Sequence, residues 1–346
     1  MKSFVVEPDG SLHLAEVPAP AIDDDHALVR MEACGVCNGT DLKLIHRQFK
    51  GYHDYPAILG HEGVGRVVEV GRNVTSFQPG DRVLLPFLEG MTGGIHSAWG
   101  AYSEYAVVGD WRAQALAGRG PGLPGYNEGY HAQQIVPESI SSVDATMIVT
   151  FREVLSAIRR FGMEANASVV VFGAGPVGLC FIRFCKLLGL GPIIVFDRKA
   201  EKLADARRMG ADVALDSGEV DPREVVRGLC PDGVDYVVDA AGVNELINQG
   251  LELVRYNGKV CCYGISPELT TQLDWSRAPY NWTLQFVQWP SKLEESQAHG
   301  QVLNWMEMGV LNPADFISDV VPFANILDAF RLVEERKAKK KIVIEF

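Results

Sequence analysis

Long apolar stretches and an excess of basic residues are both missing from this sequence. No apolar run in its 346 residues approaches the roughly 20 that a membrane-spanning helix needs. The pattern of a secretory signal, a positive start before an apolar core, is missing too. The formal net charge is −12, which disfavours a partner that carries many phosphates. We therefore expect a cytoplasmic protein that binds neither nucleic acid nor a membrane.

A regularly spaced, even set of cysteines is missing as well. The seven cysteines are odd in number and scattered along a long chain, which is typical of reduced thiols and not of a disulfide framework. There is no internal repeat and no low-complexity tract. The chain is 47% hydrophobic and long enough for two globular domains.

The strongest signal in the sequence is a glycine-rich segment between two apolar runs. Val169–Phe172 is apolar throughout, as in a strand that is buried on both faces of a parallel sheet. Gly173–Gly178 reads G-x-G-x-x-G and opens a predicted helix that extends to about Leu188. A second apolar run, Ile193–Phe196, ends at Asp197. Glycine-rich turns also join strands and helices where no ligand binds, but this order of elements favours a dinucleotide site.

The positions in this turn have separate physical roles in dinucleotide binding. Gly173 permits the tight turn, Gly175 lets the backbone approach a pyrophosphate, and Gly178 lets the helix pack closely on the strand. Pro176 stands at the helix start, where its missing N–H costs little. With Val177 it belongs to the helix end whose positive dipole faces the phosphates. We expect these five residues to contact the cofactor.

Asp197 predicts which nicotinamide dinucleotide binds. A carboxylate about 20 residues after the glycines can accept a hydrogen bond from the ribose 2′-OH of NAD, and its charge repels the 2′-phosphate of NADP. Arg198 and Lys199 argue for the opposite preference, because either can bind that phosphate. An Asp at this place can also be a plain helix N-cap. We expect NAD(H), with Asp197 and Arg198 among the residues that bind it.

Strands and helices continue to alternate as far as Tyr263, which predicts a doubly wound parallel sheet in an α/β fold. Ligands of such sheets bind beyond the carboxyl ends of the strands. The turns that contain Ala240 and Gly264 are therefore expected beside the cofactor. From about Trp282 the pattern becomes irregular. The Lys337–Lys341 cluster is interpreted as a solvated helix end before a final strand at Ile342–Phe346.

The chain before the glycine-rich segment has a different pattern. Residues 109–134 are rich in glycine with little periodicity, as in functional or mobile loops, and a helix is predicted at Val143–Phe161. The earlier part favours a small β-barrel. Its predicted strands are short and separated by glycine turns, at Ser3–Val6, Leu12–Val17, Ala27–Met31, Arg66–Val70 and Arg82–Leu85.

Three residues outside the nucleotide segment are of the types that bind zinc. Cys37, His61 and Glu62 offer a thiolate, an imidazole and a carboxylate, and three protein ligands with one open position define a catalytic zinc site. Spacing of this kind is not diagnostic. Cys34 and Cys37 also fit two small buried thiols beside a turn, and His61 also fits a loop histidine with satisfied hydrogen bonds.

Four segments, in this order, resemble the medium-chain dehydrogenase/reductase superfamily, and in particular its zinc-containing, sorbitol-dehydrogenase-like alcohol and polyol dehydrogenases. They are Cys34-Gly-Val-Cys37 with Thr40-Asp41, Gly60–Gly65, Gly80–Val83 and the Gly173–Gly178 loop. The resemblance covers essentially the whole chain. It implies a GroES-like β-barrel catalytic domain at 1–145 and 286–346, with a Rossmann domain at 146–285. It also implies one catalytic zinc, NAD(H), a small alcohol or polyol substrate, and a homodimer or homotetramer.

The same resemblance implies roles for single residues. Cys37 and His61 would be zinc ligands, and Glu62 a ligand or near-ligand. Thr40 would accept the substrate proton, and Asp41 would orient the ligand histidine. With zinc lowering the pKa of the alcohol, hydride transfer to the nicotinamide would complete the oxidation. The alternatives are a zinc-free reductase of the same fold and a homologue that binds nucleotide without catalysis.

The sequence departs from the family pattern in four places. Asn38-Gly39 lengthens the loop after Cys37 by one residue. Lys43 stands where many members have a histidine that relays the proton, and we count it among the catalytic candidates. The position of a further metal ligand aligns with Val149, with Glu153 one helical turn later as the replacement candidate. The four closely spaced cysteines of many relatives are missing, so no structural zinc is expected.

Overall fold

The computed structural model describes residues 1–346, which form two compact units. The first unit contains Met1–Arg152 and Ser291–Phe346, and the second contains Glu153–Pro290. The first boundary between them falls inside the helix α3, which runs from Ser142 to Phe161. No helix has both the length and the apolar character that crossing a membrane requires.

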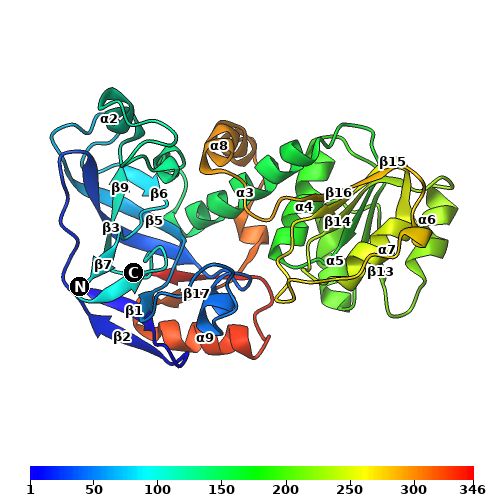
Figure 1. The fold of residues 1–346 in the computed structure, drawn as a ribbon, viewed down its shortest axis with the longest axis horizontal. Coiled ribbons are helices and arrows are strands. Elements are labelled where there is room, and N and C mark those ends of the chain that lie inside the picture. The colour runs from blue at the N-terminus through cyan, green and yellow to red at the C-terminus, as the bar shows by residue number, and fades with distance from the viewer. The chain divides into compact units, whose positions relative to one another are not determined.

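The first unit is built on two β-sheets (Figure 1). One has the strand order β2-β1-β4-β8-β7, and the other has the order β10-β6-β5-β3-β18-β17 with β9 also paired to β3. The second of these sheets combines strands from both ends of the chain, because β18 pairs with β3. Its strands are β1 (Lys2–Val6), β2 (Leu12–Glu16), β3 (His26–Gly35), β4 (Ala57–Ile58), β5 (Glu62–Val70), β6 (Arg82–Leu84), β7 (Met91–Thr92), β8 (Ile95–Ser97), β9 (Tyr105–Gly109), β10 (Ile135–Val136), β17 (Ile317–Pro322) and β18 (Lys341–Glu345).

Short helices close this unit around its own apolar core. The rings of Phe4, Tyr102 and Phe330 contact one another inside it, with centroids 4.8–6.0 Å apart, and all three are fully buried. These contacts join the first strand, a loop and a helix near the end of the chain. The remaining helices are α1 (Asp41–Ile45), α2 (Trp111–Leu116), α8 (Lys292–Glu307), α9 (Ile326–Glu334) and the 3-10 turns η1 (Glu128–His131), η3 (Pro313–Asp315) and η4 (Phe323–Asn325).

The second unit is a six-stranded sheet with the order β13-β12-β11-β14-β15-β16, and every neighbouring pair is parallel. The predicted doubly wound α/β fold is therefore confirmed. The order reverses at β11, the strand that leads into the glycine-rich turn. The elements are β11 (Val169–Phe172), α4 (Pro176–Leu187), β12 (Ile193–Asp197), α5 (Ala200–Met209), β13 (Val213–Asp216), α6 (Pro222–Leu229), β14 (Val234–Asp239), α7 (Glu245–Leu253), β15 (Val254–Cys262), η2 (Trp275–Arg277) and β16 (Trp282–Phe286).

The segment from Trp282, where no strand was predicted, begins with one. Residues Trp282–Phe286 form β16, which pairs in parallel with β15 at the edge of the sheet. Its five residues, Trp-Thr-Leu-Gln-Phe, alternate apolar and polar side chains, so a local strand signal was present. Because β16 is a short edge strand, none of its side chains is fully buried.

The excursion at residues 109–134 is tied to the barrel unit by polar contacts. The Asp110 carboxylate caps α2 and also accepts hydrogen bonds from the backbone N–H groups of Thr75 and Ser76, at 2.6 and 2.9 Å. Tyr130 donates to Glu89 at 2.8 Å. These contacts give the segment a fixed path although its sequence has little periodicity.

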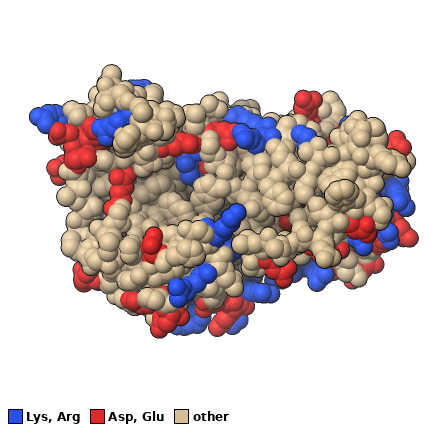
Figure 2. All heavy atoms as spheres, in the orientation of Figure 1, with Lys and Arg blue, Asp and Glu red and all other residues tan.

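Acidic and basic side chains are interspersed on the visible surface (Figure 2). In the barrel unit, for example, Glu32 accepts hydrogen bonds from both Arg66 and Arg82 at 2.9 and 2.8 Å. Burial raises the pKa of Glu32, but the two guanidinium groups outweigh it and lower the pKa below its usual value.

Candidate functional site

Strand pairing brings the three predicted zinc-binding side chains together. β3 and β5 are antiparallel, and Gly35 at the end of β3 lies opposite Glu62 at the start of β5. The loop after β3 therefore places Cys37 beside His61 and Glu62. One ligand atom from each residue lies within 4.8 Å of the others. The predicted strand at Arg66–Val70 begins earlier than expected, so Glu62 belongs to the strand and not to a loop.

Asp41 holds both Cys37 and His61 in place. Its Oδ2 accepts hydrogen bonds from the Cys37 backbone N–H at 3.0 Å and from the Tyr102 hydroxyl at 2.9 Å. Its Oδ1 lies 3.4 Å from Nδ1 of His61. Asp41 is fully buried, so its carboxylate can orient the imidazole without competition from water. Carboxylates that bind one ring nitrogen of a histidine are the usual partners of metal-binding histidines.

The electrostatic surroundings of His61 favour positive charge. Burial lowers the pKa of this histidine, but Asp41 and Cys37 outweigh it and raise the pKa well above its usual range. The same two groups would favour a metal cation, which competes with the proton for the ring nitrogen. A thiolate and an imidazole together suit zinc.

Glu62 is paired with a lysine that sequence reasoning misassigned. Lys341 is 4% exposed and is the first residue of β18, so it is not part of a solvated helix end. Its Nζ donates to both carboxylate oxygens of Glu62, at 2.6 and 2.5 Å. Thr150 in α3 donates to Oε1 at 3.3 Å. Burial raises the pKa of Glu62, but the charge of Lys341 prevails and lowers the pKa.

The other predicted catalytic residues lie around the start of α1. Thr40 is buried, and its side chain makes no capping hydrogen bond to the helix. Lys43 is half-buried, and its Nζ donates to the carbonyl of Gly39 at 3.0 Å. Burial lowers the pKa of Lys43, while the nearby Cys37 raises it. The lysine thus closes the lengthened loop through its contact with Gly39.

Val149 and Glu153 have different positions in α3. Val149 is fully buried in the barrel unit. Glu153 is the first residue of the other unit and is not one of the three grouped side chains. Between them, Thr150 is the residue of this helix that contacts Glu62.

The glycine-rich turn has the geometry that a pyrophosphate site requires. Gly173 has a φ of +95°, where other residues are strained. A Cβ atom at Gly178 would lie 1.9 Å from the carbonyl oxygen of Gly173, so a side chain cannot fit there. At Gly175 nothing lies within 4 Å of such an atom, and the backbone is open to a ligand. α4 begins at Pro176 and Val177, which directs its N-terminal dipole into this turn.

Asp197 connects the turn to the end of β12. Its Oδ2 accepts a hydrogen bond from the backbone N–H of Ala174 at 2.8 Å. Its Oδ1 accepts from the N–H groups of Arg198 and Lys199, at 2.7 and 3.0 Å. Lys202 lies 3.9 Å from Oδ2. The carboxylate therefore fixes the glycine turn from the end of β12.

The turns with Ala240 and Gly264 pack against the same end of the sheet. Ala240 donates its N–H to the carbonyl of Phe172, the last residue of β11, at 3.0 Å. At Gly264 a Cβ atom would lie 2.1 Å from the nitrogen of Gly242. The two turns therefore touch at the carboxyl ends of β14 and β15, where the parallel sheet binds ligands.

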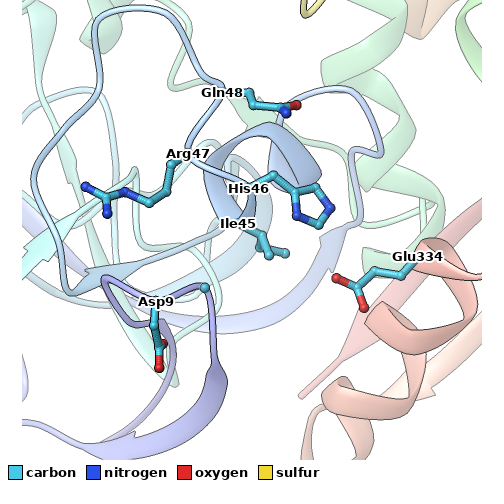
Figure 3. Close-up of a pocket in the computed structure, with 7 residues that line it drawn as sticks. Asp9, Ile45, His46, Arg47, Gln48 and Glu334 are labelled. Atoms are coloured by element: carbon cyan, nitrogen blue, oxygen red, sulfur yellow. The ribbon is translucent and has the colours of Figure 1, made fainter.

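A separate cavity of about 430 Å³ lies in the barrel unit, between the first turn, the end of α1 and the end of α9. His46 and Glu334 point toward one another across it (Figure 3). Asp9 lies on the side of His46 that is away from Glu334. Its lining does not include any member of the Cys37, His61 and Glu62 group.

Comparison with known proteins assigns the family. The pattern described as alcohol dehydrogenase GroES-like domain matches residues 23–117, and the one described as zinc-binding dehydrogenase matches residues 176–288. Sorbitol dehydrogenase of Bacillus subtilis (strain 168) is 30% identical over 77% of this chain and 75% of that protein. The chain belongs to the zinc-binding alcohol dehydrogenase family. It is therefore an oxidoreductase, as the resemblance implied.

Other members of the zinc-binding alcohol dehydrogenase family match the whole chain. The starvation-sensing protein RspB of Escherichia coli (strain K12) is 25% identical over 100% of this chain and 99% of its own length. The structure of alcohol dehydrogenase TADH from Thermus sp. ATN1 has a TM-score of 0.80 at 24% identity, with 100% of this chain and 99% of that chain covered. The latter likeness confirms the GroES-like and Rossmann fold. Zinc and a nicotinamide dinucleotide, the cofactors of this family, suit the donor set at Cys37 and the open glycine turn.

Proposed function

We propose that the chain is a dehydrogenase with one catalytic zinc that uses NAD(H) and acts on secondary alcohols, polyols or sugar-like substrates, or on their ketones. The observation that carries the proposal is the grouping of Cys37, His61 and Glu62 within 4.8 Å. The substrate class is supported by the names of relatives, sorbitol dehydrogenase among them. A zinc-free reductase would have no use for this donor set, in which His61 and Glu62 are buried.

The residues around the site would divide the work of an alcohol oxidation. When bound, zinc supplies a Lewis acid and the nicotinamide ring exchanges the hydride. Cys37 and His61 would hold the ion through Sγ and a ring nitrogen. Asp41 would keep the imidazole in one orientation, and the Thr40 hydroxyl would accept the substrate proton. Reduction of a ketone would use the same groups in reverse.

We propose that Glu62 is a near-ligand and not a permanent ligand. Both of its oxygens accept hydrogen bonds from Lys341, and a carboxylate whose charge is already matched attracts a cation less strongly. The Glu62–Lys341 pair would then add no net charge beside Cys37 and His61. Glu153 stays the other candidate for a further ligand.

Turnover with NAD(H) should exceed turnover with NADP(H). In the proposed binding mode Asp197 would lie beside the ribose, where a carboxylate would repel a 2′-phosphate. The measurement is kcat/KM for both cofactors across a panel of simple secondary alcohols, sugars and polyols. Activity on none of these would contradict the proposed function, and a clear preference for NADP(H) would show that Arg198 and Lys199 dominate over Asp197.

Lys43→Met should lose about 10-fold or more of kcat at low pH, because a proton relay contributes at least that much to the step that it assists. Relay requires a partly deprotonated amine, and burial lowers the pKa of Lys43 in that direction. Added amine buffers should restore part of the lost rate. The pH–rate profiles of wild type and variant give the comparison.

Lys43→Arg is the matched control for this prediction. Arginine can keep a hydrogen bond to Gly39 but cannot release its proton, so a relay predicts a loss in both variants. If Lys43→Arg keeps the wild-type pH–rate profile and Lys43→Met does not, the lysine only closes the loop. A raised KM without a change of profile would indicate a substrate contact, and no effect in either variant would make it a surface residue.

We also propose a cytoplasmic homodimer or homotetramer. All seven cysteines are free, which suits a reducing compartment. One side of the edge strand β16 has no neighbour within the chain, and Tyr280 and Phe286 near it are 101% and 55% exposed. Unpaired strand edges with exposed apolar side chains are surfaces that oligomers cover. Light scattering of the purified protein measures the number of subunits.

A further inference from the structure

Trp99 has an unusual backbone conformation beside the candidate metal centre. Its φ is +68°, in the left-handed region that costs a bulky L-residue about 1–2 kcal/mol. The surrounding backbone enforces it. The Trp99 carbonyl accepts a hydrogen bond from the backbone N–H of Leu88 at 2.7 Å. The N–H groups of Ala98, just before it, and of Ala101, two residues after it, donate to the carbonyls of Ile58 and Gly60 at 2.8 and 2.9 Å. Backbone strain that is held in place in this way is concentrated at functional sites.

The indole ring lies next to the predicted ligand histidine. Its centroid is 5.3 Å from that of the His61 imidazole, with an angle of 51° between the ring planes. Phe49 meets the indole edge-on, with the ring centroids 5.8 Å apart and an interplanar angle of 87°. Both Trp99 and Phe49 are only partly buried. Two aromatic side chains therefore stand beside His61 without being enclosed in the core.

Packing alone does not explain this position. Other large rings of the barrel core, such as Phe4 and Tyr102, are fully buried and have no positive φ. Leu85 does have a positive φ, of +55°, but it is fully buried. What sets Trp99 apart is a positive φ together with partial exposure beside His61. This conformation holds a partly exposed apolar face beside His61. With zinc bound at His61, the carbon skeleton of a substrate whose oxygen reaches the ion would pass close to this face.

We propose that Trp99, supported by Phe49, is a specificity-determining residue that favours ring-shaped polyhydroxylated substrates, such as sugars and cyclitols, over small aliphatic alcohols. The proposal rests on the proposed alcohol or polyol dehydrogenase function. Such rings have a face of C–H groups that packs flat on an indole, while their hydroxyl groups point outward to polar partners. A small aliphatic alcohol covers little of that face and gains little from it.

Trp99→Asn tests the proposal without breaking the backbone. Asparagine tolerates a positive φ, so this variant removes the ring and relieves the strain at the same time. The probes are myo-inositol and D-glucose as ring-shaped substrates, and 2-butanol as the small alcohol. We expect kcat/KM for the preferred ring-shaped probe to fall about 10-fold, the upper range of an aromatic stacking contact, while kcat/KM for 2-butanol changes less than about 2-fold. Trp99→Phe should keep most of the activity on rings.

Three further measurements separate the possible causes. Zinc content of Trp99→Asn should equal that of wild type, and Trp275→Ala, which changes a tryptophan that is 74% exposed in the other unit, should change neither activity. Binding of myo-inositol or D-glucose should quench tryptophan fluorescence in wild type and not in Trp99→Phe.

Equal losses with ring-shaped and small probes, or loss of zinc, would overturn the proposal, because Trp99 would then only support His61. If 2-butanol is turned over but the ring-shaped probes are neither turned over nor quench the tryptophan fluorescence, the proposal is wrong. The dehydrogenase function would then still stand. If no alcohol is turned over, the proposed function fails, and quenching that requires Trp99 still decides whether the ring face binds these molecules.

Discussion

Cys37→Ser is expected to lose bound zinc and turnover together, with kcat falling by at least about 1,000-fold, because removal of a catalytic metal removes the main source of charge stabilisation. A serine hydroxyl stays protonated at neutral pH and is a poor zinc ligand, whereas the thiolate is a strong one. Binding of NAD(H) should stay intact, since the glycine turn belongs to the other unit. Elemental analysis and calorimetric titration with NAD(H) measure the two effects separately.

Cys34→Ala provides the control. Cys34 is fully buried three residues away, and burial raises the pKa of its thiol well above the usual range, so it should stay protonated and bind no metal. This variant should keep about one zinc per chain and most of the activity. Two zinc ions per wild-type chain, or full activity after treatment with a strong chelator, would contradict the single catalytic site.

The nucleotide-binding fold is predictable from sequence because its signals are local. Gly173 and Gly178 are required by a turn and a close contact formed within a few residues, and Asp197 reaches that turn from the end of the next strand. Each position is decided by a short stretch of chain. The fold of the second unit is therefore predictable from the sequence, apart from the edge strand β16.

The metal centre is only partly predictable because its decisive contacts are long-range. Cys37, His61 and Glu62 could be named from their chemistry and from the family pattern. The partner of Glu62 could not, because Lys341 is separated from it by 279 residues and belongs to a run of lysines. One local signal was present. Lys341 directly precedes the apolar Ile342–Ile344, so it can begin a buried strand instead of ending an exposed helix.

Lys341→Met should destabilise the protein by about 3–5 kcal/mol at neutral pH, the cost of leaving one member of a buried ion pair without its partner. Glu62 is 1% exposed, so water cannot replace the ammonium group. Lys339→Met, at an exposed position in the same lysine run, should change stability by less than about 0.5 kcal/mol. Denaturant unfolding of the three proteins gives the comparison.

The double variant Glu62→Gln with Lys341→Met should recover most of this loss of stability, because it removes the uncompensated charge together with its partner.

Lowering the pH should reduce the difference in unfolding free energy between Lys341→Met and wild type. The direction of this change follows from the pKa of Glu62 in each protein. In wild type Lys341 lowers the pKa of Glu62, so the stability from the pair is present above the unfolded value of about 4.3 and is lost as pH falls through the folded pKa. In Lys341→Met the two contributions of Lys341 are gone, and burial, the largest of the contributions, raises the pKa of Glu62 against the remaining effects of His61 and Thr150. Folding then takes up a proton and becomes more favourable as pH falls. If Lys341→Met is as stable as wild type at pH 7, or if the double variant is no more stable than Lys341→Met, then Glu62 is not held as a buried anion by Lys341.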